Sequence, residues 1–167
     1  MKARRKAAVP SVSFLLRMLD EAYDHHAWHG TNLKGSLRRV RAAQAIRRPA
    51  PGRHSVWELA LHATYWKYAV LRRLTGAKRG SFPVKGSNWF SPPKAASEKA
   101  WREVLELLEQ THRSLREAVA ALPAAALTRR TKGSRYTPAE HVAGIAFHDV
   151  YHAGQIQLVK RLLRSSR

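Results

Sequence analysis

Apolar residues recur every three to four positions through four long stretches of this chain, and nowhere do they alternate as they would in a β-strand. The stretches cover residues 10–30, 55–74, 97–122 and 137–163, and each is bounded by proline, glycine or a capping residue. This pattern predicts an all-α fold. We expect a four-helix up-and-down bundle with a short accessory helix and long inter-helix loops.

The clearest helix starts are at Ser55 and Thr137. Ser55 precedes Glu58 by three residues, which is the spacing of a capping box, and Thr137 is followed by a proline and then by Glu140. Residues 31–40 could form the accessory helix. The long loop from Gly76 to about residue 95 contains aromatic residues that either cover a pocket mouth or cap one end of the core.

A length of 167 residues suits one domain, which we place at residues 11–164 behind a basic flexible tail at residues 1–10. The chain has no cysteine, which excludes disulfides, thiolate metal sites and a cysteine nucleophile. No signal-peptide pattern and no apolar run of roughly 18 residues occurs, so we expect a cytoplasmic protein without a membrane partner.

The formal net charge of +20 comes from 31 Lys and Arg residues against 11 Asp and Glu residues. Such a surplus attracts nucleic acid, anionic lipid or anionic substrates. The basic residues are spread over the tail, the loops and the helix ends, which is also the pattern of a solvated surface with a compositional bias. No recognition helix or aromatic stacking motif accompanies them, so nucleic-acid binding rests on charge alone.

Two histidines, His148 and His152, lie four residues apart in the last stretch, and this spacing puts both imidazoles on one helix face. About 0.4 such pairs are expected by chance among nine histidines, and a second pair exists at His25 and His29. In a first helix that ends at Gly30, His29 lies on the inward stripe while His25 points elsewhere. The first-helix pair is therefore the weaker candidate for a metal site.

A third histidine, His62, lies early in the stretch 55–74. With alternating helix directions, this stretch would run parallel to 137–163, and His62, His148 and His152 would lie roughly 10, 16 and 22 Å along their helices. His62 could then face the other two. Three imidazoles with an open position make a catalytic metal site, whereas the alternative is three core histidines with separate hydrogen bonds. Without cysteine, such a site suits Zn, Ni, Fe or Mn.

The segments WELALH at 57–62 and HDVYHAGQI at 148–156 together resemble the DinB/YfiT-like family of metal-dependent enzymes. The family pattern is one histidine early in the second helix and an H-x3-H in the fourth, often followed by G-Q-I. The resemblance runs from about residue 13 to 164, with further matches at 28–30, 48–55 and 87–90.

This resemblance implies a four-helix bundle, commonly dimeric, with a divalent metal (Zn, Ni, Fe or Mn) held by His62, His148 and His152. Similar proteins include S-transferases that use the thiols bacillithiol or mycothiol, and a mycothiol-dependent maleylpyruvate isomerase. We therefore expect a metal-dependent transferase or hydrolase, a homodimer, that acts on a small-molecule substrate. The alternatives are a basic nucleic-acid-binding module and a structural metal-binding bundle without catalysis.

Five further residues are candidates for contacts with the ligands or the substrate. Glu58 lies one turn before His62 and either accepts an imidazole N–H or serves only as a capping partner. Tyr151 and Gln155 flank the histidine pair and are candidates to orient the substrate or the ligands. Trp28 and His29, expected near the mouth of the site, are candidate substrate contacts. His141 is about 10 Å of helix rise from His148, too far to share its coordination sphere.

Overall fold

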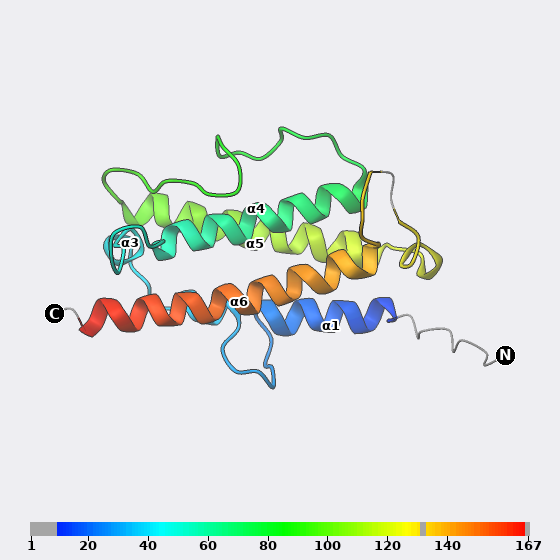
Figure 1. Ribbon diagram of the computed structural model, residues 1–167, viewed down its shortest axis with the longest axis horizontal. Helices are drawn as coiled ribbons and strands as arrows, with labels where there is room; N and C mark the ends of the chain where they lie inside the picture. The colour runs from blue at the N-terminus through cyan, green and yellow to red at the C-terminus, as the bar shows by residue number, and fades with distance from the viewer. Residues whose placement is uncertain (1–9, 131–132, 166–167) are drawn as a thin grey trace.

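The computed structural model describes residues 10–130 and 133–165, so that only Pro10 of the expected basic tail lies within the described part. No strand occurs among these residues, and the all-α bundle predicted from the sequence is confirmed (Figure 1). The long helices are α1 (Val12–Tyr23), α4 (Val56–Thr75), α5 (Glu98–Ala120) and α6 (Pro138–Ser165). The accessory structure consists of α2 (Leu33–Leu37), α3 (Ala42–Ala45) and the 3₁₀ turn η1 (Ala124–Ala126).

Both predicted capping boxes are present. At the start of α4, the Glu58 N–H donates to the Ser55 hydroxyl at 3.3 Å and the Glu58 carboxylate accepts the Ser55 N–H at 2.8 Å. At the start of α6, Glu140 and Thr137 make the same pair of hydrogen bonds, at 3.3 and 2.7 Å. Helix α4 ends at Gly76, whose φ of 73° is the left-handed conformation that glycine adopts without steric cost. These contacts fix where the two site-bearing helices begin.

Helix α1 is shorter than the sequence predicted, because it ends at Tyr23 instead of continuing to Gly30. The prediction that His29 lies on its inward face is therefore wrong. Beyond Tyr23 the polar residues are exposed, so a further turn would have almost no apolar surface to bury. The chain turns away there, and Asn32 donates a hydrogen bond to the backbone oxygen of His25 at 2.8 Å.

Contacts along the bundle show that α4 and α5 run in the same direction. Near the start of both helices Trp57 packs on Trp101, with 5.2 Å between ring centroids. Further along both, the Lys67 ammonium lies 3.1 Å from Nδ1 of His112. The connection from residue 76 to 97 therefore carries the chain back along the bundle before α5 begins, and Figure 1 shows this loop extending beside α4. Helix α4 has 20 residues and is about 30 Å long, so only a long connection can make this return.

Helices α4 and α6 run antiparallel. The early α4 residue His62 contacts the late α6 residue His152, with 4.8 Å between ring centroids, whereas Lys67 further along α4 pairs with the earlier Asp149. The prediction that these two helices run parallel is wrong. It followed from strict alternation of helix direction, and the chain departs from that alternation at the α4–α5 connection.

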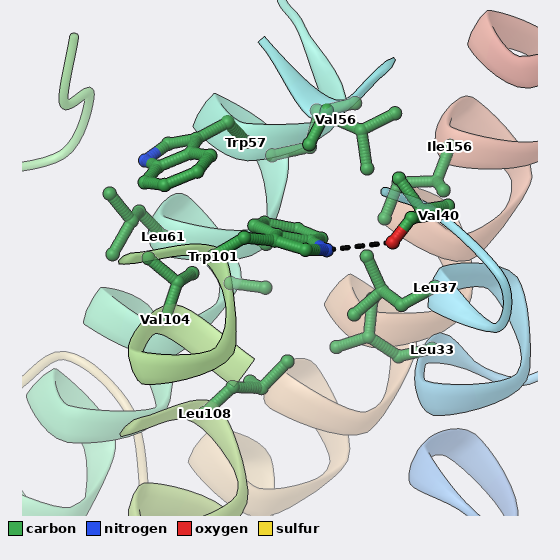
Figure 2. Packing of buried hydrophobic residues seen from close by; sticks show 14 of the residues in the cluster. Leu33, Leu37, Val40, Val56, Trp57, Leu61, Trp101, Val104, Leu108 and Ile156 are labelled. Carbon is green, nitrogen blue, oxygen red and sulfur yellow. Dashed lines mark hydrogen bonds between the residues drawn. The ribbon is translucent and has the colours of Figure 1, made fainter. Parts of the chain in front are cut away.

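The core consists of two apolar clusters separated by a polar layer. One cluster surrounds Trp101, whose indole N–H donates to the backbone oxygen of Val40 at 2.8 Å (Figure 2). The other lies toward the opposite ends of α4, α5 and α6 and includes the inward residues of α1, such as Leu19. Between them along the helices lie the histidines and a buried ion pair. None of the described helices has the length and apolarity that a membrane span requires.

Candidate metal centre

Three histidine side chains from two helices converge in the polar layer. Nε2 of His148 lies 3.2 Å from Nε2 of His62 and 3.0 Å from Nε2 of His152. One ligand atom from each residue lies within 4.8 Å of those of the other two. His148 and His152 are one turn apart on α6, and the antiparallel packing of α4 brings His62 opposite them.

The connection between α4 and α5 fixes the orientation of His62. Its Nδ1 donates to the backbone oxygen of Asn88 at 2.8 Å, and the Asn88 side chain accepts the Trp66 indole N–H at 3.0 Å. Asn88 has a φ of 62°, a left-handed conformation that asparagine tolerates better than most residues. With its proton on Nδ1, the His62 ring presents the lone pair of Nε2 to the other two histidines.

A second hydrogen-bond chain orients His152. Its Nδ1 lies 2.6 Å from Oε1 of Gln155, and Nε2 of Gln155 donates to the Tyr151 hydroxyl at 3.1 Å. An amide oxygen can only accept, so the His152 proton lies on Nδ1 and its Nε2 lone pair also faces the cluster. Tyr151 and Gln155, which the sequence singled out, thus contact this ring directly or through one intermediate.

The nitrogen positions fit a metal ion. Zn–N bonds of 2.0–2.1 Å at tetrahedral angles separate two ligand nitrogens by roughly 3.3 Å, close to the 3.2 and 3.0 Å found here. Without a cation, lone pairs this close would repel each other unless a proton lay between them. Three ligands would leave at least one coordination position open, which is the arrangement of catalytic sites.

The surroundings keep the imidazoles neutral, as ligands must be. Burial, together with the neighbouring His152 and His62, lowers the pKa of His148 to about 3. Burial likewise lowers the pKa of His152 to about 4, although its hydrogen bond to Gln155 opposes the shift. Nδ1 of His148 is buried and has no hydrogen-bond partner among the described residues, so its ring is held by packing.

Trp89 covers the His62 side of the cluster. Its ring stacks on the His62 imidazole at 3.9 Å between centroids, and His54 stacks on Trp89 at 3.6 Å. The neighbouring Phe90 is instead 4% exposed and packs into the first apolar cluster. Phe90 thus caps the core, as one of the two interpretations of the loop aromatics predicted, whereas Trp89 covers a histidine ring.

A comparison with models of known protein families shows to which family the chain belongs. The family model described as the DinB superfamily matches residues 15–156, a span that includes all three histidines. The chain belongs to the DinB superfamily. Among curated proteins and solved structures, no match was found.

The DinB bundle also contains a buried ion pair that the sequence analysis missed. Lys67 and Asp149 form this pair with both side chains fully buried, and the Lys67 ammonium also donates to Nδ1 of His112. Burial raises the pKa of Asp149 to about 6, against the opposing effect of Lys67. The sequence did carry a signal, because Lys67 shares a helical stripe with Ala63 and Val70, and Asp149 lies among buried apolar positions of α6.

The other candidate residues lie apart from the histidine cluster. Glu58 accepts hydrogen bonds from the Ser55 N–H and from Nε and Nη2 of Arg48, the latter two at 3.0 and 2.6 Å, which accounts for its carboxylate without His62. Trp28 is 98% exposed, and it lies with the exposed His29 in the loop that follows α1. In Figure 1 this loop extends to the side of α6 away from α4, so the structure does not bring either residue to the DinB site.

Proposed function

We propose that this DinB protein is a divalent-metal-dependent enzyme in which His62, His148 and His152 hold the ion. The observation that supports it most is the convergence of three Nε2 atoms, two of them from rings whose Nδ1 atoms are engaged elsewhere. Imidazole ligands suit Zn, Ni, Fe or Mn.

A divalent ion in this site would supply a positive charge that favours an anionic nucleophile at neutral pH. The protein's own residues would contribute the rest. The stacked Trp89 and His54 exclude water on the His62 side, while Trp66 and His148 border a groove that leaves the cluster accessible. Gln155 and Tyr151 hold the His152 ring in its orientation.

We propose thiol transfer as the reaction. The chain has no cysteine, so a thiol nucleophile must come from a small molecule such as bacillithiol or mycothiol. The thiol would lose its proton, and its sulfur would form a bond to an electrophilic carbon of the second substrate. In a substitution, that carbon would release its leaving group; in an addition, the atom next to that carbon would take up the proton. Hydrolysis, with water in place of the thiol, is the second form of the same proposal.

Metal content measured by mass spectrometry tests the site. We expect about one ion per chain in the wild type and in the control His29→Ala, which changes an exposed histidine. His62→Ala and His148→Ala should lower metal affinity at least tenfold. Unchanged uptake in His62→Ala would contradict the metal centre.

Product analysis with each thiol and an electrophile then tests the reaction. Conjugation that is lost in His62→Ala supports transfer, and release of an acid or alcohol without the thiol supports hydrolysis. Tight metal binding that raises stability without any turnover would favour a structural role. Binding to nucleic acid with a steep salt dependence, unaffected by His62→Ala, would favour the basic binding module.

We further propose that the protein forms a homodimer through the outer face of α6. Three large side chains on this face are exposed, Phe147 at 64%, Tyr151 at 63% and Leu158 at 58%. Their spacing places them along one side of the helix, where a second copy would bury them. Sedimentation of the wild type should give the dimer mass, and Leu158→Glu should shift it to the monomer, whereas the control Lys99→Glu, an exposed position on α5, should leave the dimer mass unchanged. A monomeric wild type would overturn this proposal.

A further inference from the structure

A groove of about 610 Å³ extends from the histidine cluster between α4 and α6. His148 and Trp66 border its inner end, and Val70 and Ile145 line its middle. A cavity of this volume with apolar walls suits a small organic ligand.

The outer end of the groove is cationic. Arg73 on α4 and Arg135, in the segment before α6, both line it. Arg73 is half-buried, and neither guanidinium lies within 4.0 Å of a carboxylate in the part of the chain that the structure describes. The Arg73 guanidinium is 3.4 Å from the backbone oxygen of Ala69, at the long limit of a hydrogen bond. Burial lowers the pKa of Arg73, as do the charges of Arg72 and Arg79, so its positive charge lacks compensation.

Glu140, the one acidic residue among the described residues that line the groove, does not supply that compensation. Glu140 is exposed, and its Oε2 accepts hydrogen bonds from the Thr137 N–H and hydroxyl at 2.7 and 2.8 Å. Its carboxylate therefore belongs to the cap of α6. The two guanidinium groups remain available to an anion from solution, for which arginine offers paired N–H donors.

We infer that this groove binds a small organic anion, a carboxylate, with the anionic group at Arg73 and Arg135 and an apolar body over Val70 and Ile145. This inference rests on the proposed function in one respect, because it assumes that the reaction takes place at His148, where the groove meets the proposed metal site. The groove spans the two helical turns between His141 and His148, about 10 Å of rise. The substrate's reacting atom should lie at a comparable distance from its carboxylate.

Calorimetric titration with 4-phenylbutyrate and with its neutral amide, 4-phenylbutanamide, tests the inference. The two probes differ in charge and hardly in shape. We expect the acid to bind the wild type at least tenfold more tightly than the amide, and Arg73→Met to abolish that preference. Arg72→Met removes the same charge from the neighbouring position, outside the groove, and should retain the preference. Arg135→Met should weaken the binding of the acid in the same way as Arg73→Met does.

Equal binding of the acid and the amide to the wild type would overturn the inference. Arg73→Met and Arg72→Met that lose the preference for the acid to the same extent would also overturn it. A carboxylate can also coordinate a metal, so each titration is repeated on chelator-treated protein and on His62→Ala. If the preference for the acid over the amide disappears in chelator-treated protein and in His62→Ala but survives in Arg73→Met, the carboxylate binds the metal. That result would overturn the inference of an anion site in the groove. A protein that takes up no metal but retains the Arg73-dependent preference would refute the proposed function and leave the anion site standing.

Discussion

Lys67 and Asp149 place opposite charges in the middle of the bundle, where both side chains are fully buried. Removing one partner from a buried pair leaves an uncompensated charge, whereas replacing both with apolar residues of similar size often costs little. We expect Lys67→Met to lower the free energy of unfolding by about 3–5 kcal/mol. The double variant Lys67→Met with Asp149→Leu should recover most of that loss. Denaturant unfolding of the wild type, Lys67→Met, Asp149→Leu and the double variant, with the exposed Lys99→Met as control, measures both effects. If the losses in the two single variants add up in the double variant, the pairing is contradicted.

The buried His112 makes the stability of the metal-free protein depend on pH. Burial, followed by the charge of Lys67, lowers the pKa of His112 to about 3 in the fold, against an ordinary value of 6.5. The folded state therefore binds fewer protons than the unfolded state between these values, and the free energy of unfolding falls as the pH falls below 6.5. At pH 5 the loss from this residue is about 2 kcal/mol.

His112→Gln retains a hydrogen-bond acceptor for Lys67 and removes the titrating group. Between about pH 7.5 and pH 5, the chelated wild type should lose about 2 kcal/mol more stability than His112→Gln. Urea unfolding at a series of pH values measures the difference. Parallel pH profiles for the two proteins would show that His112 does not titrate in this way.

At the residue scale, the sequence contained the three histidines of the cluster and the residues that orient His152, Gln155 and Tyr151, but not the loop contacts that support His62. His148 and His152 followed from helix periodicity, and His62 followed from the family pattern. The depth argument that joined them reached the right neighbours through a wrong assumption, since the two helices are antiparallel. The backbone oxygen of Asn88 and the ring of Trp89 could not be placed, because a loop's path depends on tertiary contacts that no periodicity encodes.

The connection 76–97 shows why helix direction was harder to predict than helix position. Capping residues and apolar periodicity located α4 and α6 to within a few residues. Nothing in a periodic pattern states which way the next helix runs, and only the length of the connection indicated it. Short connections join antiparallel neighbours, whereas a parallel neighbour requires a segment as long as the helix itself. The same segment places Asn88 and Trp89 against His62.

Gly76 and Gly144 offer a matched comparison at the level of the helix. A Cβ would meet nothing within 4 Å at either position, but Gly76 ends α4 with a φ of 73° and Gly144 lies inside α6. Gly76→Ala should therefore lower stability by about 1 kcal/mol, and Gly144→Ala should raise it by about 0.5–1 kcal/mol. In a domain of this size, 1 kcal/mol corresponds to about 2–4 °C in melting temperature. Shifts of the same sign would contradict the comparison.

For the whole molecule, the net charge of +20 opposes compaction. Positive charges repel each other over a Debye length of about 30 Å at 0.01 M salt but only about 8 Å at 0.15 M. We expect the melting temperature to rise over that range of sodium chloride, because screening stabilises the folded state more than the expanded one. Differential scanning calorimetry measures the shift. A melting temperature that falls as salt is added would show that attractive ion pairs, such as Arg116 with Asp20, outweigh the repulsion.

The histidine cluster joins residues that lie 86 positions apart in the chain, His62 on α4 and His148 on α6. An ion held by both would therefore act as a reversible cross-link that closes a loop containing half of the protein. By the loop-closure relation for covalent cross-links, a closure of this length restricts the unfolded chain by about 4–5 kcal/mol. Chelation should then promote unfolding by restoring conformational freedom to the unfolded chain, even if the folded bundle hardly changes.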